Sequence, residues 1–314
     1  MKARKQKLWA RMKKYSFAYY FILPTTLAML FLHLSPIVQG LYMSFLKLNQ
    51  FTLQQYLLAP FVGFENYYKV LIDPGSPIRI GLFEAVRNTF IYTIIVTIGT
   101  IVIGMIVALM MNRKFFGRPL VRTLFLFPWI VPTYVTGLLW GIIWLKQGGL
   151  VNVMLADWLR ILPFKPSWLS GPNTLWAIII PTVWRYWPLS MLMLLAGLQT
   201  IPEELYEAAD IDGAGSWRKF WMITWPMLRP VWFILILFGL IYNTYSFNIV
   251  IMMFGFGAGY PGEWGDLMMT NIFRNSFQLW NFGTGAATSA LLLIFMICVV
   301  NVWFRYFKKS EDMR

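Results

Sequence analysis

The chain has 314 residues, of which 58% are hydrophobic and 13% are charged, and its formal net charge is +14. Soluble domains carry about 25% charged residues, so this composition excludes an ordinary soluble protein and predicts an all-α polytopic membrane protein. A helix needs about 20 apolar residues to cross the hydrocarbon core. Six such stretches occur, at about 17–46, 88–111, 123–145, 174–198, 231–254 and 284–304.

The basic segment 1–16 precedes the first apolar stretch. That stretch is too long for a signal peptide and is followed by no small-x-small cleavage site, which predicts an uncleaved first span in the domain 17–304. His33 and Cys298 each stand alone inside a predicted span. A metal site needs several ligands and a disulfide needs two cysteines, so we expect no metal site and no intrachain disulfide.

Lys and Arg residues indicate how the spans are oriented. With the N-terminus inside, 18 of the 27 fall in 69 inner residues and 8 in 98 outer residues. This bias predicts that both termini, including the basic segment 305–314, are cytoplasmic. The predicted outer loops are about 47–87, 146–173 and 255–283, and the long inner loop is 199–230. The basic character is therefore a topology signal, and we expect no nucleic-acid partner.

The inner loop 199–230 contains an acidic block. Five of the 13 acidic residues lie between Glu203 and Asp212, without any Lys or Arg. The pattern Thr200 to Glu203 predicts a capping box, followed by a helix to about Ile211, a turn at Gly213 and a second helix capped by Ser216. Acidic groups are repelled by an anionic leaflet, so the block either faces a basic partner or is a solvated loop whose acids cap helices.

The spacing within this loop is specific. Glu207-Ala208-Ala209, Asp212-Gly213-Ala214, Ile223 and Pro226 resemble the EAA loop of permease subunits in binding-protein-dependent ABC importers, with Trp225 in place of the usual Leu. Val62 to Tyr67, Arg87 to Thr89 and Asn281 to Gly283 extend the resemblance to the maltose, glycerol-phosphate and multiple-sugar group. It implies a type I importer transmembrane domain whose coupling helices lie within 203–222. The coupling residues it implies are Glu203, Glu204, Glu207, Ala208, Ala209, Asp210, Asp212, Gly213, Ala214, Ile223 and Pro226.

The same resemblance implies the partners. We expect a heterodimer with a second permease, two copies of a cytoplasmic ATPase, and a periplasmic or extracellular solute-binding protein, in a bacterial cytoplasmic (inner) membrane. The sequence has no G-x-x-x-x-G-K-[ST] motif, so ATP and Mg²⁺ are expected on the ATPase and this chain is expected to be a non-enzymatic subunit without a cofactor. The G-x-G-x-x-G at Gly257, Gly259 and Gly262 opens no strand–helix unit and is interpreted as an outer loop.

Among the Lys, Arg, Asp and Glu residues, Arg185 is the one inside a predicted span, which marks it as a functional candidate. Aromatic rings and polar groups of the fourth and fifth spans suit the C–H faces and hydroxyls of a sugar. The predicted substrate-pathway residues are Trp184, Arg185, Tyr186, Trp187, Asn243, Tyr245 and Asn248. Hydrogen bonding between helices is the alternative for the two Asn residues. Arg also suits a carboxylate or phosphate, so the substrate is a di- or oligosaccharide that is neutral or acidic.

Two small-residue stretches predict close helix packing, Gly137-x-x-x-Gly141 and Gly283 to Ala290. A non-sugar solute such as glycerol phosphate remains the alternative cargo. An ion-coupled secondary transporter is disfavoured because every Asp and Glu lies outside the six spans. A membrane-embedded enzyme is disfavoured because no catalytic cluster is present.

Overall fold

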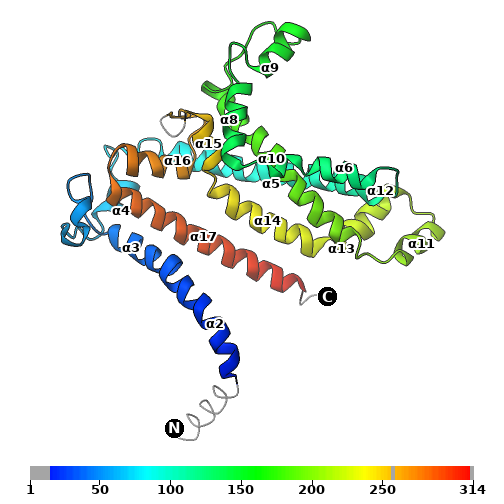
Figure 1. The fold of residues 1–314 in the computed structure, drawn as a ribbon, viewed down its shortest axis with the longest axis horizontal. Helices are drawn as coiled ribbons and strands as arrows, with labels where there is room; N and C mark the ends of the chain where they lie inside the picture. Colours follow the sequence, from blue (N-terminus) through cyan, green and yellow to red (C-terminus); the bar gives the residue numbers. More distant parts are fainter. Residues whose placement is uncertain (1–14, 256–258, 312–314) are drawn as a thin grey trace, which may run out of the picture. The chain divides into compact units, whose positions relative to one another are not determined.

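The computed structural model describes residues 15–255 and 259–311, with side chains as far as Phe307 (Figure 1). The predicted leader up to residue 14, Gly257 and residues 312–314 lie outside the described residues. All regular elements of the described part are helical, apart from an isolated bridge between Leu46 and Phe61. This confirms the all-α prediction.

The elements follow one another as short and long helices. Up to residue 173 they are α2 (Ser16–Met29), η1 (Leu30–Leu34), α3 (Ser35–Met43), η2 (Leu53–Leu58), α4 (Glu65–Leu71), α5 (Leu82–Asn112), α6 (Arg118–Phe125), α7 (Phe127–Ile130), α8 (Thr133–Ile143), α9 (Leu150–Asn152), η3 (Val153–Trp158) and η4 (Gly171–Asn173). The remainder are α10 (Thr174–Leu198), α11 (Glu204–Ile211), α12 (Ser216–Lys219), η5 (Phe220–Thr224), α13 (Trp225–Met227), α14 (Arg229–Thr244), α15 (Asn248–Met253), α16 (Met268–Phe273), η6 (Arg274–Gln278) and α17 (Phe282–Glu311).

Four continuous stretches of the described chain are long and apolar enough to cross a membrane: Ser16–Met43, Leu82–Asn112, Gly171–Leu198 and Phe282–Phe307. Two further candidates are bent pairs. Arg118–Ile130 and Thr133–Ile143 meet at 86°, and Ser216–Met227 and Arg229–Thr244 meet at 67°. If each bent pair is one span, the total is six, the number expected from the sequence.

The structure differs from the predicted spans in two places. The third stretch, 123–145, breaks at Val131 and Pro132, because Pro has no N–H to donate and drives the residue before it out of the helical conformation. The fifth stretch, 231–254, is interrupted between Thr244 and Asn248. There the polar run supplies side chains that compete for backbone hydrogen bonds.

The described residues form two compact units, and the first comprises residues 15–76 and 275–293. Its buried Asn66 donates from Nδ2 to the carbonyls of Ser44 and Leu46, both at 2.8 Å. A Cβ on Gly283 would lie 2.5 Å from the Leu46 carbonyl. The predicted close packing at Gly283 is therefore present, within this unit.

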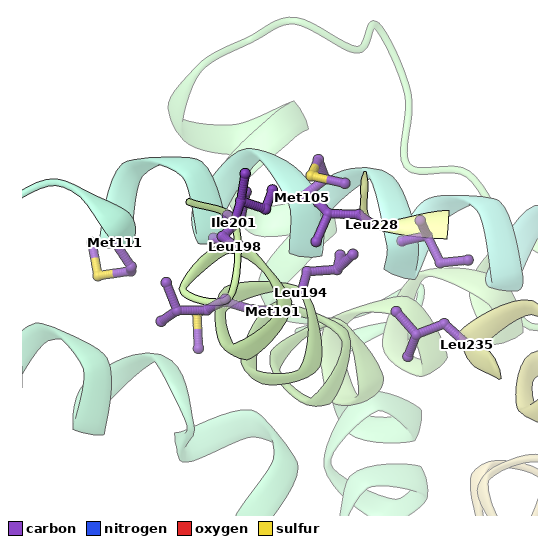
Figure 2. Packing of buried hydrophobic residues seen from close by; sticks show 11 residues of the cluster. Met105, Met111, Met191, Leu194, Leu198, Ile201, Leu228 and Leu235 are labelled. Carbon is purple, nitrogen blue, oxygen red and sulfur yellow. The ribbon is translucent and has the colours of Figure 1, made fainter. Parts of the chain in front are cut away.

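The second unit comprises residues 77–255, 259–274 and 294–311. Within it, α10 lies along α5 (Figure 1). A Cβ on Gly104 would meet Ser190 Cβ at 2.7 Å, so the two helices approach closely at that level. Figure 2 shows the apolar core around this contact. Its labelled members are Met105, Met111, Met191, Leu194, Leu198, Ile201, Leu228 and Leu235.

The predicted seam at Gly137 and Gly141 is also present. A Cβ on Gly137 would lie 2.5 Å from the Ile249 carbonyl oxygen, and one on Gly141 would lie 3.0 Å from that of Met253. Helix α8 therefore packs tightly on α15, the short helix after the break at residues 245–247 (Figure 1). The two interrupted stretches are joined to each other through small residues.

Candidate functional site

The acidic loop, residues 199–230, contains the predicted helix–turn–helix. Helix α11 ends at Ile211, and Gly213 has a φ of +73°, a left-handed conformation that glycine adopts without strain. The Ala214 N–H donates to the Ala209 carbonyl at 2.8 Å, which closes the end of the helix. The turn expected at Gly213 is therefore confirmed.

The two predicted N-caps are wrong. Helix α11 begins after Glu203 without a side-chain cap, because the Thr200 hydroxyl instead donates to the Gly197 carbonyl at the end of α10. Helix α12 follows Gly215, and Ser216 is its first helical residue. Neither helix therefore begins with a side-chain cap.

Two polar contacts hold α11 against the segment that follows the turn. The Tyr206 hydroxyl lies 2.9 Å from the Thr224 hydroxyl, and Lys219 Nζ lies 2.6 Å from Asp210 Oδ1. Trp225 stacks on Trp232 at a centroid distance of 5.4 Å. The tryptophan that departs from the EAA pattern therefore finds its own aromatic partner, and the loop is a folded element.

The outward surface of the loop is acidic and apolar at once. Glu203, Glu204, Glu207, Ala208, Asp210, Asp212 and Gly213 are exposed, whereas Ala209, Ala214, Ile223 and Pro226 are half-buried. Ile211 is 88% exposed and Trp217 is 74% exposed. Large apolar side chains beside a block of charge are typical of a surface that binds another protein.

A second candidate site is a cavity of about 400 Å³ inside the second unit. Helices α5, α7, α8, α10, α14 and α15 and the break at 245–247 supply its wall. The lining residues are Val96, Thr100, Trp129, Thr133, Tyr186, Leu189, Ser190, Met193, Leu235, Phe238, Gly239, Tyr242, Asn243, Tyr245, Ser246, Phe247, Asn248 and Ile249. Aromatic rings form much of the wall, and hydroxyl and amide groups are its polar side-chain groups. None of these lining residues is charged.

Four of the predicted pathway residues line this cavity: Tyr186, Asn243, Tyr245 and Asn248. The other three do not. Trp184 packs edge-on against Trp140, and Trp187 packs against Phe125. These two tryptophans point to neighbouring helices because residues 184 and 187 lie on other faces of α10 than residue 186.

Asn243 lies at the cavity wall and also forms a hydrogen bond between helices, which was the alternative to a pathway role. It lines the cavity, and its Nδ2 donates to Thr97 Oγ1 at 3.0 Å, which joins α14 to α5. Ser246, in the break, lies 2.8 Å from the hydroxyl of buried Tyr92, which also lies 3.0 Å from Thr182 Oγ1. Hydrogen bonds thus fix the interrupted chain at the cavity wall.

Sequence reasoning missed several hydroxyl groups of the cavity, namely those of Thr100, Thr133, Ser190, Tyr242 and Ser246. A signal for one of them was available. Ser190 and Met193 follow Tyr186 at the i+4 and i+7 spacing that keeps residues on one face of a helix. Thr133 flanks one helix break and Ser246 lies within the other, and the hydrophobic pattern alone did not reveal these breaks.

Arg185 lies beside the cavity and does not line it. Its Nη1 donates to the Trp129 carbonyl at 2.8 Å, and its Nη2 donates to Thr133 Oγ1 at 2.9 Å. Its Cζ lies 5.1 Å from the centre of the Tyr186 ring. The three residues that it contacts all line the cavity.

A buried polar network lies within the predicted outer loop 255–283 and joins it to α5. Asp266 is fully buried; it accepts from Thr270 Oγ1 at 2.7 Å and forms an ion pair with Arg274 at 2.9 Å. Burial raises the pKa of Asp266, against the attraction of Arg274. Asn88 of α5 donates to the backbone carbonyl of Asp266 at 3.1 Å. The sequence did not predict that Asp266 is buried in such a network.

Comparison with known proteins decides the family. Residues 100–311 match the family described as the binding-protein-dependent transport system inner membrane component. The chain belongs to this family. The matched region contains both the acidic loop and most of the cavity, so the two sites are parts of an ABC transporter permease, as the EAA resemblance predicted.

Relatives extend the match over most of the permease. This chain is 34% identical over 278 residues to the sulfoquinovosyl glycerol transport system permease protein SmoG of Agrobacterium fabrum. The alignment covers 88% of this chain and 85% of that protein. This chain is 33% identical to the trehalose/maltose transport system permease protein MalF of Thermococcus litoralis, with coverage of 81% and 82%.

A solved structure shares the fold. The crystal structure of a bacterial ABC transporter involved in the import of the acidic polysaccharide alginate matches with a TM-score of 0.77 and 21% identity, over 96% of this chain and 99% of that one. The fold is therefore that of an ABC importer permease.

Proposed function

We propose that this permease forms half of the translocation pathway for a carbohydrate in an ATP-driven importer. The observation that carries the proposal is the cavity, whose wall combines aromatic rings with uncharged hydroxyl and amide groups. Aromatic faces pack on the apolar C–H surface of a sugar ring, and hydroxyls and amides pair with its hydroxyls. The names of two relatives, for sulfoquinovosyl glycerol and for trehalose and maltose, support the same class.

The acidic loop is proposed to be the site that an ATPase subunit binds. Its exposed carboxylates and its exposed Ile211 and Trp217 suit a cleft with basic and apolar walls. Closure of two ATPase subunits on ATP would then move the loop and the helices joined to it, because the contact differs between the two states. In this proposal the ATPase holds ATP and Mg²⁺, and the permease itself catalyses no reaction.

The assembly completes the proposal. A second, distinct permease would supply the other half of the pathway, two ATPase copies would bind on the cytoplasmic side with both termini of this chain, and a solute-binding protein would deliver the sugar outside. A related alginate transporter has been solved in complex with an alginate pentasaccharide-bound periplasmic protein, which supports the last partner.

Glycerol phosphate is the alternative cargo, since a glycerol-3-phosphate permease is 26% identical over 292 residues. The lining residues favour the sugar, because none of them is an Arg or Lys that could form a charge-assisted hydrogen bond with a phosphate.

The test is uptake of labelled solutes by the complete transporter in proteoliposomes. The panel contains a neutral disaccharide, a uronic-acid oligosaccharide and glycerol phosphate. We expect ATP-dependent uptake of at least one saccharide, and loss of that uptake in Glu207→Ala although the complex still assembles. Glu65→Ala, which removes an exposed carboxylate outside the acidic loop, is the matched control and should retain uptake. Uptake that follows an ion gradient and ignores ATP would overturn the proposal.

A further inference from the structure

The break between α7 and α8 leaves a backbone problem. In a continuous helix the Trp129 carbonyl would accept from the Thr133 N–H, four residues later. Here Val131 and Pro132 are extended, and the helices on either side of them diverge by 86°. Irregular backbone at membrane depth is tolerated only where protein or water satisfies its polar groups. The Trp129 carbonyl therefore needs a partner, which is either water or another part of the chain.

Arg185 of α10 is that partner. Its Nη1 reaches the Trp129 carbonyl and its Nη2 reaches Thr133 Oγ1, so a single guanidinium holds the residues on both sides of the break. The guanidinium is planar and presents its donors in a fixed fork. Two bonds from one rigid group therefore constrain the angle between the two helices, and not only their distance.

The constraint is transmitted to the cavity. Trp129, Thr133 and Tyr186 are contacted by Arg185 and line the cavity, whereas Arg185 itself does not. Helix α8 packs on α15 through Gly137, and α15 begins with lining residue Asn248. A change in the direction of α8 would therefore move several parts of the wall together.

We propose that Arg185 is a positioning residue of the translocation pathway. It satisfies the backbone at the break, sets the direction of α8 and so shapes the cavity, without binding the sugar. This inference rests on the proposed carbohydrate pathway. Two of its three guanidinium nitrogens, Nη1 and Nη2, donate to protein atoms, and these hydrogen bonds stabilise the charge within a predicted span.

The first test compares uptake kinetics of the complete transporter for neutral and anionic saccharides. In Arg185→Met we expect KM to rise by at least about tenfold, by a similar factor for every transported saccharide. Arg185→Lys should recover part of the loss, because an ammonium can satisfy the Trp129 carbonyl but lacks the fork. Thr133→Val should have a smaller effect, which adds little to that of Arg185→Met because both remove the same contact.

A loss confined to anionic saccharides would overturn the inference, because it would show that Arg185 binds the substrate. Wild-type KM in Arg185→Met, or full additivity with Thr133→Val, would also overturn it. Should Arg185→Met fail to assemble, Thr133→Val and Arg185→Lys carry the same test.

The second test detects a change in the angle as a change in the distance between two spin labels, and it needs no substrate. With Cys298 replaced by Ala, spin labels are placed at Leu120 on α6 and Ile142 on α8, both exposed, in the assembled transporter. We expect one narrow distance distribution in the parent protein and a broadened or shifted one with Arg185→Met. Labels at Val86 and Met110, along unbroken α5, are the control and should not change.

An unchanged distribution between Leu120 and Ile142 would overturn the inference even if uptake were lost. If wild type takes up no saccharide, the proposed function fails, and the spin-label result still decides whether Arg185 sets the angle.

Discussion

Replacing Gly137 by Ala tests whether the contact between α8 and α15 is as close as the structure shows. The new Cβ would lie 2.5 Å from the Ile249 carbonyl oxygen and 2.8 Å from Met252 Cβ. One of these atoms belongs to the backbone of α15, so a helix must shift. Overpacking of this kind costs about 1–3 kcal/mol, while Ala in place of Gly inside a helix gains about 1 kcal/mol. We expect Gly137→Ala to lose up to about 2 kcal/mol of unfolding free energy.

Gly40→Ala is the matched control. Gly40 also lies inside a helix, α3, and its Cβ would meet no atom within 4 Å. The gain in helix propensity is common to both variants and cancels, so Gly137→Ala should be less stable than Gly40→Ala by about 1–3 kcal/mol. The assay is SDS-induced unfolding of the purified permease in mixed micelles, followed by circular dichroism. Equal or greater stability of Gly137→Ala would refute the close contact.

Three further predictions concern the acidic loop and the outer network. Gly213→Ala, at φ +73°, should strain the turn by about 1–2 kcal/mol and lower ATP-dependent uptake more than Gly215→Ala, whose φ is −66°. Tyr206→Phe removes the hydrogen bond to Thr224 and should cost about 1 kcal/mol, measured by the same SDS titration; no change would show that the bond adds nothing. Because burial raises the pKa of Asp266 above its ordinary 3.8, its stabilising contribution is complete below pH 3.8 and is lost as pH rises through the raised value. The difference in melting temperature, wild type minus Asp266→Asn, should therefore become smaller as the pH is raised above 3.8. If this difference instead becomes larger, the attraction of Arg274 outweighs the effect of burial on the pKa of Asp266.

The acidic loop could be predicted in detail because its signals are local. The positive φ of Gly213 and the helix that ends at Ile211 follow from residue types at fixed spacing. The caps could not be predicted from the sequence, because the Thr200 hydroxyl donates to the Gly197 carbonyl at the end of α10 and not to the loop that follows. The roles of Tyr206 and Lys219 depend on contacts across the turn, 18 and 9 residues along the chain.

The pathway residues divide in the same way. Aromatic and polar residues in a span predicted a cavity, and Tyr186, Asn243, Tyr245 and Asn248 line one. Their neighbours Trp184 and Trp187 face other helices, because adjacent residues on a helix point in directions about 100° apart. Only the packing of α10 against its neighbours shows which of these faces meets the cavity.

The sequence by itself determined that this protein is helical and membrane-embedded, and it located the loop that places it among importer permeases. The length of the apolar stretches, the distribution of Lys and Arg, and the spacing of the EAA loop are properties of short segments. They do not depend on how the helices pack. Tertiary structure alone decided where the spans break, which side chains line the cavity, and that Arg185 hydrogen-bonds to the residues flanking a break 52 and 56 positions earlier in the chain. Those features depend on helices that meet only after folding, because a buried polar group is satisfied by whichever partner packing brings within reach.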